Sequence, residues 1–141
     1  MKLCFAGHRD AWHCVGVEEL IIPKLKSLIS QGYDTFFDGG LGEFDTICLN
    51  ALIDLKKVYP QIKIIKVLTH YNAKKKYSQV YDEVIMPDIE NVFYKQLIIQ
   101  RNKWIVDNSD GILCHIENEF NSGAYNMLKY ALKKGLNIYK V

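Results

Sequence analysis

Short apolar segments alternate along the chain with longer segments in which apolar residues recur at helical spacing. The short segments have the length and the aliphatic, β-branched or aromatic content of buried strands. They are Leu3–Ala6, which Gly7 ends, and then Thr35–Phe37, Ile62–Leu68, Glu83–Met86, Gly111–His115 and Asn137–Lys140. We expect each of them to form one strand.

Four longer segments between these strands have apolar residues on one face, three or four positions apart. They are Val17–Gln31, Glu43–Tyr59, Phe93–Asn108 and Ala124–Lys134. Gly32 and Pro60 follow the first two and are typical of helix ends. Pro23 lies inside the first segment, so that helix begins either at Val17 or near Ile22, where the proline would occupy the first turn.

Strands that alternate with helices of this length predict a parallel sheet with helices on both faces. Right-handed crossovers then give a doubly wound, Rossmann-like α/β fold. No repeat or linker divides the chain, so we expect residues 1–141 to form one domain. Ligands of such sheets bind outside the carboxyl ends of the strands, and the loops that follow the strands therefore hold the candidate site.

Composition and charge exclude several classes of protein. With 141 residues, 49% hydrophobic and 24% charged, the chain fits one globular domain and not a disordered chain. The net charge of +2 argues against a nucleic-acid partner, and the basic run Lys74–Lys76 suits a solvated loop. No apolar run is long enough for a membrane span or a signal peptide. The four cysteines lack metal-binding spacing, so we expect a cytoplasmic protein without a metal or cofactor.

The loop after the first strand contains Gly7, His8, Arg9 and Asp10. Glycine permits a sharp turn directly after a strand. Arg9 either pairs with Asp10 or contacts an anion or a ribose, because a guanidinium offers a planar fork that fits phosphate. Since two groups capable of positive charge meet at the expected pocket, Gly7, His8 and Arg9 are candidate ligand-binding residues.

The loop after the second strand contains three glycines, Gly39, Gly40 and Gly42, just before a helix. Such a loop can bring backbone N–H groups close to a phosphate, with the positive end of the helix aimed at the same place. The pattern is neither the GxGxxG of dinucleotide-binding proteins nor a P-loop, so it predicts only a generic phosphate cradle. Glu43 and Asp45 either stabilise the first turn of the helix, or one of them accepts a ribose hydroxyl.

Two further features lie later in the chain. Residues 121–123, Asn-Ser-Gly, precede the last helix, where they either cap it or form a second phosphate or sugar site. Arg101 lies in the middle of an apolar stripe on the long helix. Because a buried arginine needs an anionic partner, Arg101 either binds an anionic group of a ligand or forms an internal salt bridge. The acidic candidates for such a bridge are Asp38, Asp45 and Asp107.

Four segments taken together resemble a known family. They are Phe5-Ala6-Gly7-His8-Arg9, then Gly39-Gly40-Leu41-Gly42-Glu43-Phe44-Asp45, then residues 101–111 (Arg-Asn-Lys-Trp-Ile-Val-Asp-Asn-Ser-Asp-Gly), and Ser122-Gly123 before a helix. In this order they resemble the small YpsA/YoqJ-like proteins of the SLOG superfamily, from about Lys2 to Val141. The resemblance implies a Rossmann-like fold and a nucleotide or nucleotide sugar at the mouths of the strands.

The superfamily includes cytokinin-activating phosphoribohydrolases, DNA-processing proteins and sensor domains for signals derived from ADP-ribose. The phosphoribohydrolases have Arg-Lys and then Gly-Gly-x-Gly-Thr-x-x-Glu, of which the Arg and the Glu are catalytic. Arg101 lies where that arginine would fall, but the second motif is replaced by residues 121–127. Neither Asn126 nor Met127 titrates near neutral pH, so neither can serve as a general base. The carboxylates that could take this role, although the spacing does not require it, are Glu43, Asp45 and Glu119.

These features favour a protein that binds a nucleotide-derived small molecule of the ADP-ribose or cyclic-nucleotide type, as a sensor or by sequestering it, without catalysis. In this hypothesis Asp45 or Asn126 holds the ribose, and Tyr71 stacks on the base. The candidate ligand-binding residues are Gly7, His8, Arg9, Gly39, Gly40, Gly42, Asp45, Tyr71, Arg101, Asn102, Ser122, Gly123 and Asn126.

Two alternatives stay open at this point, an N-glycoside hydrolase or transferase acting on nucleoside monophosphates and a DNA-processing accessory protein. The long helix also carries more apolar residues than one face can bury. Together with the resemblance, this surface predicts a homodimer or a higher homo-oligomer.

Overall fold

Strands and helices alternate along the chain, as the sequence pattern predicts. The computed structural model describes residues 1–40, 42–69, 79–89, 93–117 and 122–141. In these ranges the strands are β1 (Lys2–Gly7), β2 (Thr35–Asp38), β3 (Lys63–Val67), β4 (Glu83–Ile85), β5 (Gly111–His115) and β6 (Asn137–Lys140). The helices are α1 (Val17–Ser30), α2 (Glu43–Val58), α3 (Tyr94–Asp107) and α4 (Gly123–Lys134), together with a short 3₁₀ helix, η1 (Ala11–Cys14).

The strands of the described ranges pair in parallel in one six-stranded sheet, in the order β4-β3-β2-β1-β5-β6. From β1 the chain builds outward through β2, β3 and β4, and it then returns to place β5 on the other side of β1. The direction of building therefore reverses between β1 and β5, where a doubly wound sheet has its ligand crevice. The expected Rossmann-like α/β fold with a parallel sheet is confirmed.

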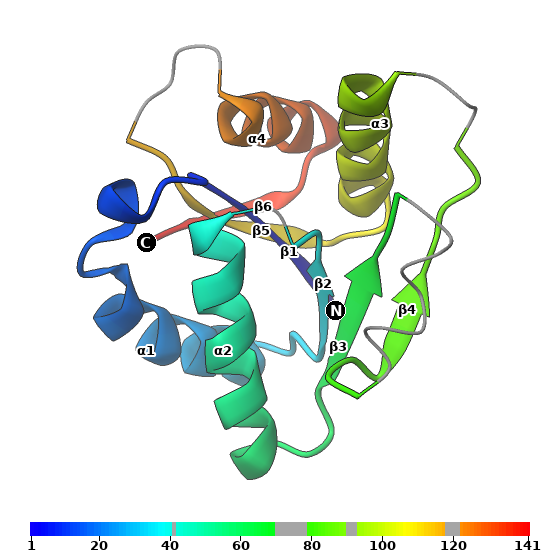
Figure 1. Ribbon diagram of the computed structural model, residues 1–141. Helices are drawn as coiled ribbons and strands as arrows, with labels where there is room; N and C mark the ends of the chain where they lie inside the picture. The colour runs from blue at the N-terminus through cyan, green and yellow to red at the C-terminus, as the bar shows by residue number, and fades with distance from the viewer. Residues whose placement is uncertain (41, 70–78, 90–92, 118–121) are drawn as a thin grey trace.

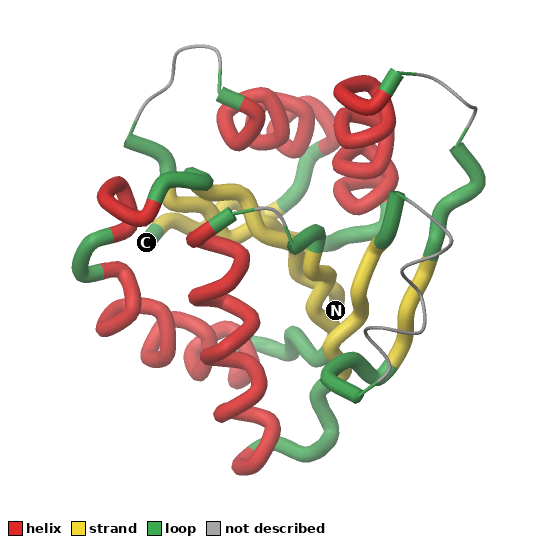
Figure 2. The backbone as a smooth tube through the Cα atoms, viewed as in Figure 1, coloured by secondary structure: helices red, strands yellow, loops and turns green. Residues whose placement is uncertain are grey.

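Helices cover both faces of the sheet, with α1 and α2 together on one face and α3 and α4 together on the other (Figures 1 and 2). Each pair of helices encloses an apolar core. One core includes Phe36 and Leu52, and the other includes Phe37 and Leu128. Phe36 and Phe37 are neighbours in β2 and serve opposite cores, because successive side chains of a strand point to opposite faces. Among the described helices, none is both long and apolar enough to span a bilayer.

The N-terminal segment differs from the expectation in two places. α1 begins at Val17 and continues through Pro23, so the alternative start near Ile22 is wrong. Proline has no N–H group to donate to the carbonyl group of Glu19, one turn earlier. Because Pro23 is exposed on the helix surface, that carbonyl group can bond to water instead. The helix η1 was not predicted, because four residues are too few to show a period.

Candidate functional site

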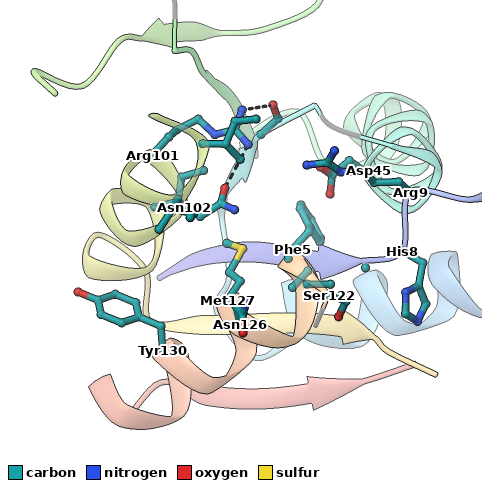
Figure 3. Close-up of a pocket in the computed structure, with 18 of the residues that line it drawn as sticks. Phe5, His8, Arg9, Asp45, Arg101, Asn102, Ser122, Asn126, Met127 and Tyr130 are labelled. Atoms are coloured by element: carbon teal, nitrogen blue, oxygen red, sulfur yellow. Dashed lines mark hydrogen bonds between the residues drawn. The ribbon is translucent and has the colours of Figure 1, made fainter. Parts of the chain in front are cut away.

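A cavity of about 780 Å³ opens at the carboxyl ends of β1 and β2, beside the segment that follows β5 (Figure 3). It lies where the strand order reverses, and its volume falls within the roughly 300–1,000 Å³ of small-molecule and cofactor sites. Side chains of α3 and α4 line one side of it. The loops after β1 and β2, together with the first turn of α2, line the rest.

Most of the candidate ligand-binding residues line this cavity. They are Gly7, His8, Arg9, Gly39, Asp45, Arg101, Asn102, Ser122, Gly123 and Asn126. Gly40 and Gly42 belong to the same loop as Gly39 but are not part of the lining. Tyr71, expected to stack on a base, lies outside the described residues. The fold thus gathers segments that are far apart in the sequence at one site.

Arg101 is a buried cation at the α3 side of the cavity. It projects from the middle of α3 and is only 5% exposed. Nη1 donates to the carbonyl oxygen of Gly39 at 2.9 Å, and Nη2 donates to Oδ1 of Asn102 at 3.1 Å (Figure 3). Nε is buried and has no hydrogen-bond partner within the described part of the chain. Because Nε and Nη2 lie on one edge of the guanidinium, this edge retains unused donor capacity.

The internal salt bridge considered for Arg101 is absent among the described residues. Asp38 pairs with a buried lysine, and Asp107 lies 3.5 Å from Nζ of Lys134, but no carboxylate of the described ranges lies within 4 Å of the guanidinium. Burial lowers the pKa of Arg101, and the more distant carboxylates of Asp45 and Asp38 oppose this effect only in part. The structure therefore leaves an incompletely compensated cation at the cavity.

A buried ion pair between Lys66 and Asp38 lies behind the loop after β2. Nζ of Lys66 is 3.7 Å from Oδ2 of Asp38. Tyr81 donates its O–H to the same oxygen, and the N–H of Gly40 donates to Oδ1 at 2.8 Å. Burial lowers the pKa of Lys66, and the Asp38 carboxylate opposes that shift. This network fixes the turn after β2, in which the carbonyl oxygen of Gly39 accepts the hydrogen bond from Arg101.

Glycines after β1 and β2 let two protein segments approach each other closely. A Cβ on Gly7 would lie 2.1 Å from the ring of Phe44, and a Cβ on Gly42 would lie 2.5 Å from Cα of Arg9. Gly42 also has a φ of 106°, which other residues rarely adopt. At this separation the first two N–H groups of α2 donate to the carbonyl oxygens of Arg9 and His8. These N–H groups, considered for a phosphate cradle, are thus engaged by the loop after β1.

The start of α4 is capped by Ser122. Its Oγ accepts a hydrogen bond from the N–H of Tyr125 at 3.0 Å, and its carbonyl oxygen accepts one from the N–H of Asn126 at 3.0 Å. Ser122, Gly123 and Asn126 also line the cavity. The capping role is therefore observed, and contact of these residues with a ligand stays a prediction.

Three histidines and Glu117 lie together across the cavity from Arg101, as the position of His8 in Figure 3 shows. The ring of His8 is 4.8 Å from that of His13 and 6.2 Å from that of His115. Nε2 of His8 accepts a hydrogen bond from the N–H of Glu117 at 2.7 Å. Burial lowers the pKa of His8, and the neighbouring histidines lower it further. Only His8 was predicted from the sequence, because η1, which brings His13 to the cavity, carries no periodic signal.

The first turns of α3 form an apolar wall of the cavity, which was not predicted from the sequence. Tyr94, Ile98 and Ile99 line the cavity there. The buried residues of α3 all lie in its second half, from Arg101 onward. A half-exposed wall of aromatic and aliphatic side chains suits a flat, largely apolar group such as a nucleobase.

In the described ranges, no group of three or more His, Cys, Asp or Glu residues could hold a metal ion. The cysteines are free and buried. Burial raises the pKa of the Cys4 thiol to about 12, so this cysteine is protonated at neutral pH and unsuited to act as a nucleophile.

Fold and site together define a class of protein, a Rossmann-like α/β domain with a cavity at the reversal of strand order and a buried arginine in its lining. Within this class the chain matches the YpsA family model, described as the YspA SLOG family, over residues 2–140. The protein belongs to this SLOG family. The resemblance carried by the sequence motifs is thereby confirmed.

Two further proteins are similar to this chain. A UPF0398 protein of Bacillus velezensis is 20% identical over a gapped alignment of 148 positions, which covers 94% of this chain and 81% of that protein. The solved structure of DNA processing protein A from Helicobacter pylori, a protein that binds single-stranded DNA, matches with a TM-score of 0.66 at 18% identity. The match covers 99% of this chain but only 64% of that one. At this identity the likeness shows the fold alone.

We expect Asn102→Asp to stabilise the protein and to weaken anion binding at the same time. The new carboxylate would lie where Oδ1 now accepts from Arg101, and would give the guanidinium the partner it lacks. A charge-assisted hydrogen bond is worth about 1 kcal/mol more than a neutral one, so the free energy of unfolding should rise by about that amount. Urea denaturation measures this change, and titration calorimetry with ADP-ribose measures the affinity.

Asn126→Asp is the matched control, because it adds the same charge to the cavity from α4 rather than beside Arg101. It should weaken anion binding less and should not stabilise the protein. Equal effects of the two substitutions on both measurements would contradict the assigned role of Arg101.

Proposed function

We propose that the protein binds a nucleotide-derived small molecule, of the ADP-ribose or cyclic-nucleotide type, through an anionic group that contacts Arg101. One observation carries this proposal. Arg101 is buried at the cavity, and in the described part of the chain it has neither a carboxylate within ion-pair distance nor a partner for Nε. A buried cation in this state is stabilised by an anion. Arg9, which also lines the cavity, supplies a second cation.

The rest of the cavity suits the other parts of such a ligand. Its volume is that of a site for a cofactor-sized molecule, and the wall of Tyr94 and Ile98 suits a base. Asp45 and Asn126 offer oxygen atoms that can accept hydrogen bonds from a ribose. We further propose that the protein acts in the cytoplasm as a sensor, or by sequestering the ligand, and leaves the ligand intact.

Isothermal titration calorimetry with ADP, ADP-ribose and cyclic adenine nucleotides tests this proposal. The expected result is saturable heat with at least one of them, and an affinity that falls as salt is added, because the contacts are charged. If no ADP-ribose derivative gives heat, the proposal fails. Chromatography of the mixture after titration separates binding from catalysis, since free base would support the N-glycoside hydrolase and intact nucleotide supports a binding protein.

Single-stranded DNA is a second candidate ligand, favoured by the side chains at the start of α3. Phe93 is 84% exposed and Tyr94 is 56% exposed. Tyr94 and the adjacent Lys95 line the cavity. Exposed aromatic rings with nearby cations are typical of sites for unpaired bases. The similar fold of the Helicobacter pylori protein, which binds single-stranded DNA, adds support. A gel shift that persists at physiological salt would favour this ligand, and its loss at that salt would exclude it.

We also propose that two copies of the chain associate through α3. Phe93 and Ile99 are 84% and 53% exposed, which is unusual for large apolar side chains on one short stretch. Ile105 and Val106 add to the apolar content of the same helix, but they are buried within the fold and cannot contribute to this surface. Sedimentation equilibrium of the protein and of a Phe93→Ser variant tests this association.

A further inference from the structure

The histidine cluster gives the cavity a second polar end, away from Arg101. The cluster consists of His8, His13, His115 and Glu117. Figure 3 places His8 and Arg101 on opposite sides of the cavity. The hydrogen-bond partners of each ring show which of its nitrogen atoms is left for a ligand.

Hydrogen bonds within the fold engage ring nitrogens of His115 and of His8. Nδ1 of His115 lies 2.9 Å from the main-chain oxygen of Val141, and Nε2 lies 2.8 Å from that of His13. Both nitrogens of His115 are therefore engaged by main-chain oxygens and are not left for a ligand. Nε2 of His8 accepts from the N–H of Glu117, so it carries no proton and His8 is neutral.

His13 has one ring nitrogen engaged within the fold. Nδ1 of His13 donates to Oε2 of Glu117 at 3.2 Å. In the neutral ring this leaves the lone pair on Nε2. This atom has no hydrogen-bond partner among the described residues, and His13 lines the cavity.

Asp10 supplies another acceptor at the same end. It lines the cavity three residues before His13, and its carbonyl oxygen accepts the N–H of His13 at 3.2 Å, which holds both residues in one turn. A carboxylate and an imidazole lone pair both accept hydrogen bonds from hydroxyl groups. A vicinal diol has two hydroxyl groups to donate.

We propose that Nε2 of His13 and the carboxylate of Asp10 form a diol subsite, which receives the ribose of the bound nucleotide. The inference rests on the proposed function, and it moves the ribose from Asp45 or Asn126 to the η1 end of the cavity. The ligand then extends from its anionic group at Arg101 to its ribose at His13. The protein should accordingly distinguish ribonucleotides from deoxyribonucleotides.

Titration calorimetry of the whole protein with ADP, 2′-deoxy-ADP and 3′-deoxy-ADP tests the subsite. Wild type should bind ADP about 3–10-fold more tightly than the deoxy analogues, the effect of losing one neutral hydrogen bond. In His13→Leu the preference for one of the two hydroxyl groups should disappear. Val15→Ala is the control, because Val15 lies just after η1, is 82% exposed and is outside the cavity lining, and it should keep the preference.

Each contrary result has a separate meaning. Equal affinity of wild type for ADP and both deoxy analogues overturns the diol subsite and leaves the proposed function standing, and this comparison does not depend on the folding of any variant. An equal loss of affinity for all three nucleotides in a folded His13→Leu also overturns the subsite, because His13 would then contact the phosphates. Absence of binding by ADP overturns the subsite, and absence of binding by the whole nucleotide panel overturns the proposed function as well.

Discussion

Lys66→Met is expected to lower the free energy of unfolding by about 3–5 kcal/mol, the usual cost of leaving one member of a buried ion pair without its partner. Lys66 and Asp38 are 5% and 2% exposed, so water cannot replace the lost ammonium group. Methionine keeps much of the volume of the lysine stem, so the loss reports mainly the charge. Urea denaturation followed by circular dichroism measures the effect.

Lys63→Met is the matched control, since Lys63 lies on the same strand but is exposed. It should change stability by less than about 0.5 kcal/mol, as surface substitutions usually do. Adding Asp38→Asn to Lys66→Met should restore part of the loss, because the uncompensated carboxylate is removed. If Lys66→Met costs no more than Lys63→Met, the buried ion pair does not stabilise the fold.

Arg101 and Lys66 show what a pattern of residues can predict about a buried charge. Arg101 lies on an apolar helical stripe, and Lys66 lies in the apolar strand segment Ile62–Leu68, which also contains the exposed Lys63. The pattern indicates only that a cation in such surroundings can be buried. It does not indicate the partner, which for Lys66 is Asp38, its in-register neighbour on β2. Strand order and register decide that pairing, and they follow from the tertiary structure.

Glycine patterns predict close approach without saying what approaches. Gly7 was expected to permit a sharp turn and Gly42 to bring backbone N–H groups close to a ligand, and the structure uses them to bring Phe44 and Arg9 within contact. The local requirement is the same whether a ligand or another protein segment approaches, because a bulky group fits there only when the residue has no Cβ. A glycine-rich loop in a single sequence therefore locates a site better than it identifies its occupant.

The histidine cluster depends on contacts between distant parts of the chain. His13 and Glu117 are 104 residues apart in sequence, and the pairing of β1 with β5 brings their loops together. Sequence reasoning predicted that these loops meet at the crevice. It could not predict the turn of η1 that directs His13 back toward Glu117, because the backbone of a short 3₁₀ segment is set by its tertiary contacts.

Arg101→Met is expected to weaken the binding of an anionic nucleotide by about 1.5–3 kcal/mol, the range of a charge-assisted hydrogen bond, which is roughly a ten- to 150-fold loss of affinity. The unliganded protein should keep its stability within about 1 kcal/mol or gain some, because replacing a buried charge by an apolar side chain of similar size is often neutral or stabilising. The lost hydrogen bonds to Gly39 and Asn102 offset part of that gain. Calorimetry and urea denaturation of the one variant give both numbers.

Lys95→Met separates this effect from a general loss of positive charge. Lys95 lines the cavity from the same helix but is exposed, so its charge is screened by water and salt. Its removal should weaken binding by less than about 1 kcal/mol, and less still at high salt. A destabilised, unliganded Arg101→Met with unchanged affinity would instead assign Arg101 to the framework of the loop after β2. Loss of a ligand-binding arginine weakens binding and leaves stability unchanged, whereas loss of a structural arginine lowers stability and leaves binding unchanged. The two measurements together therefore decide between these roles.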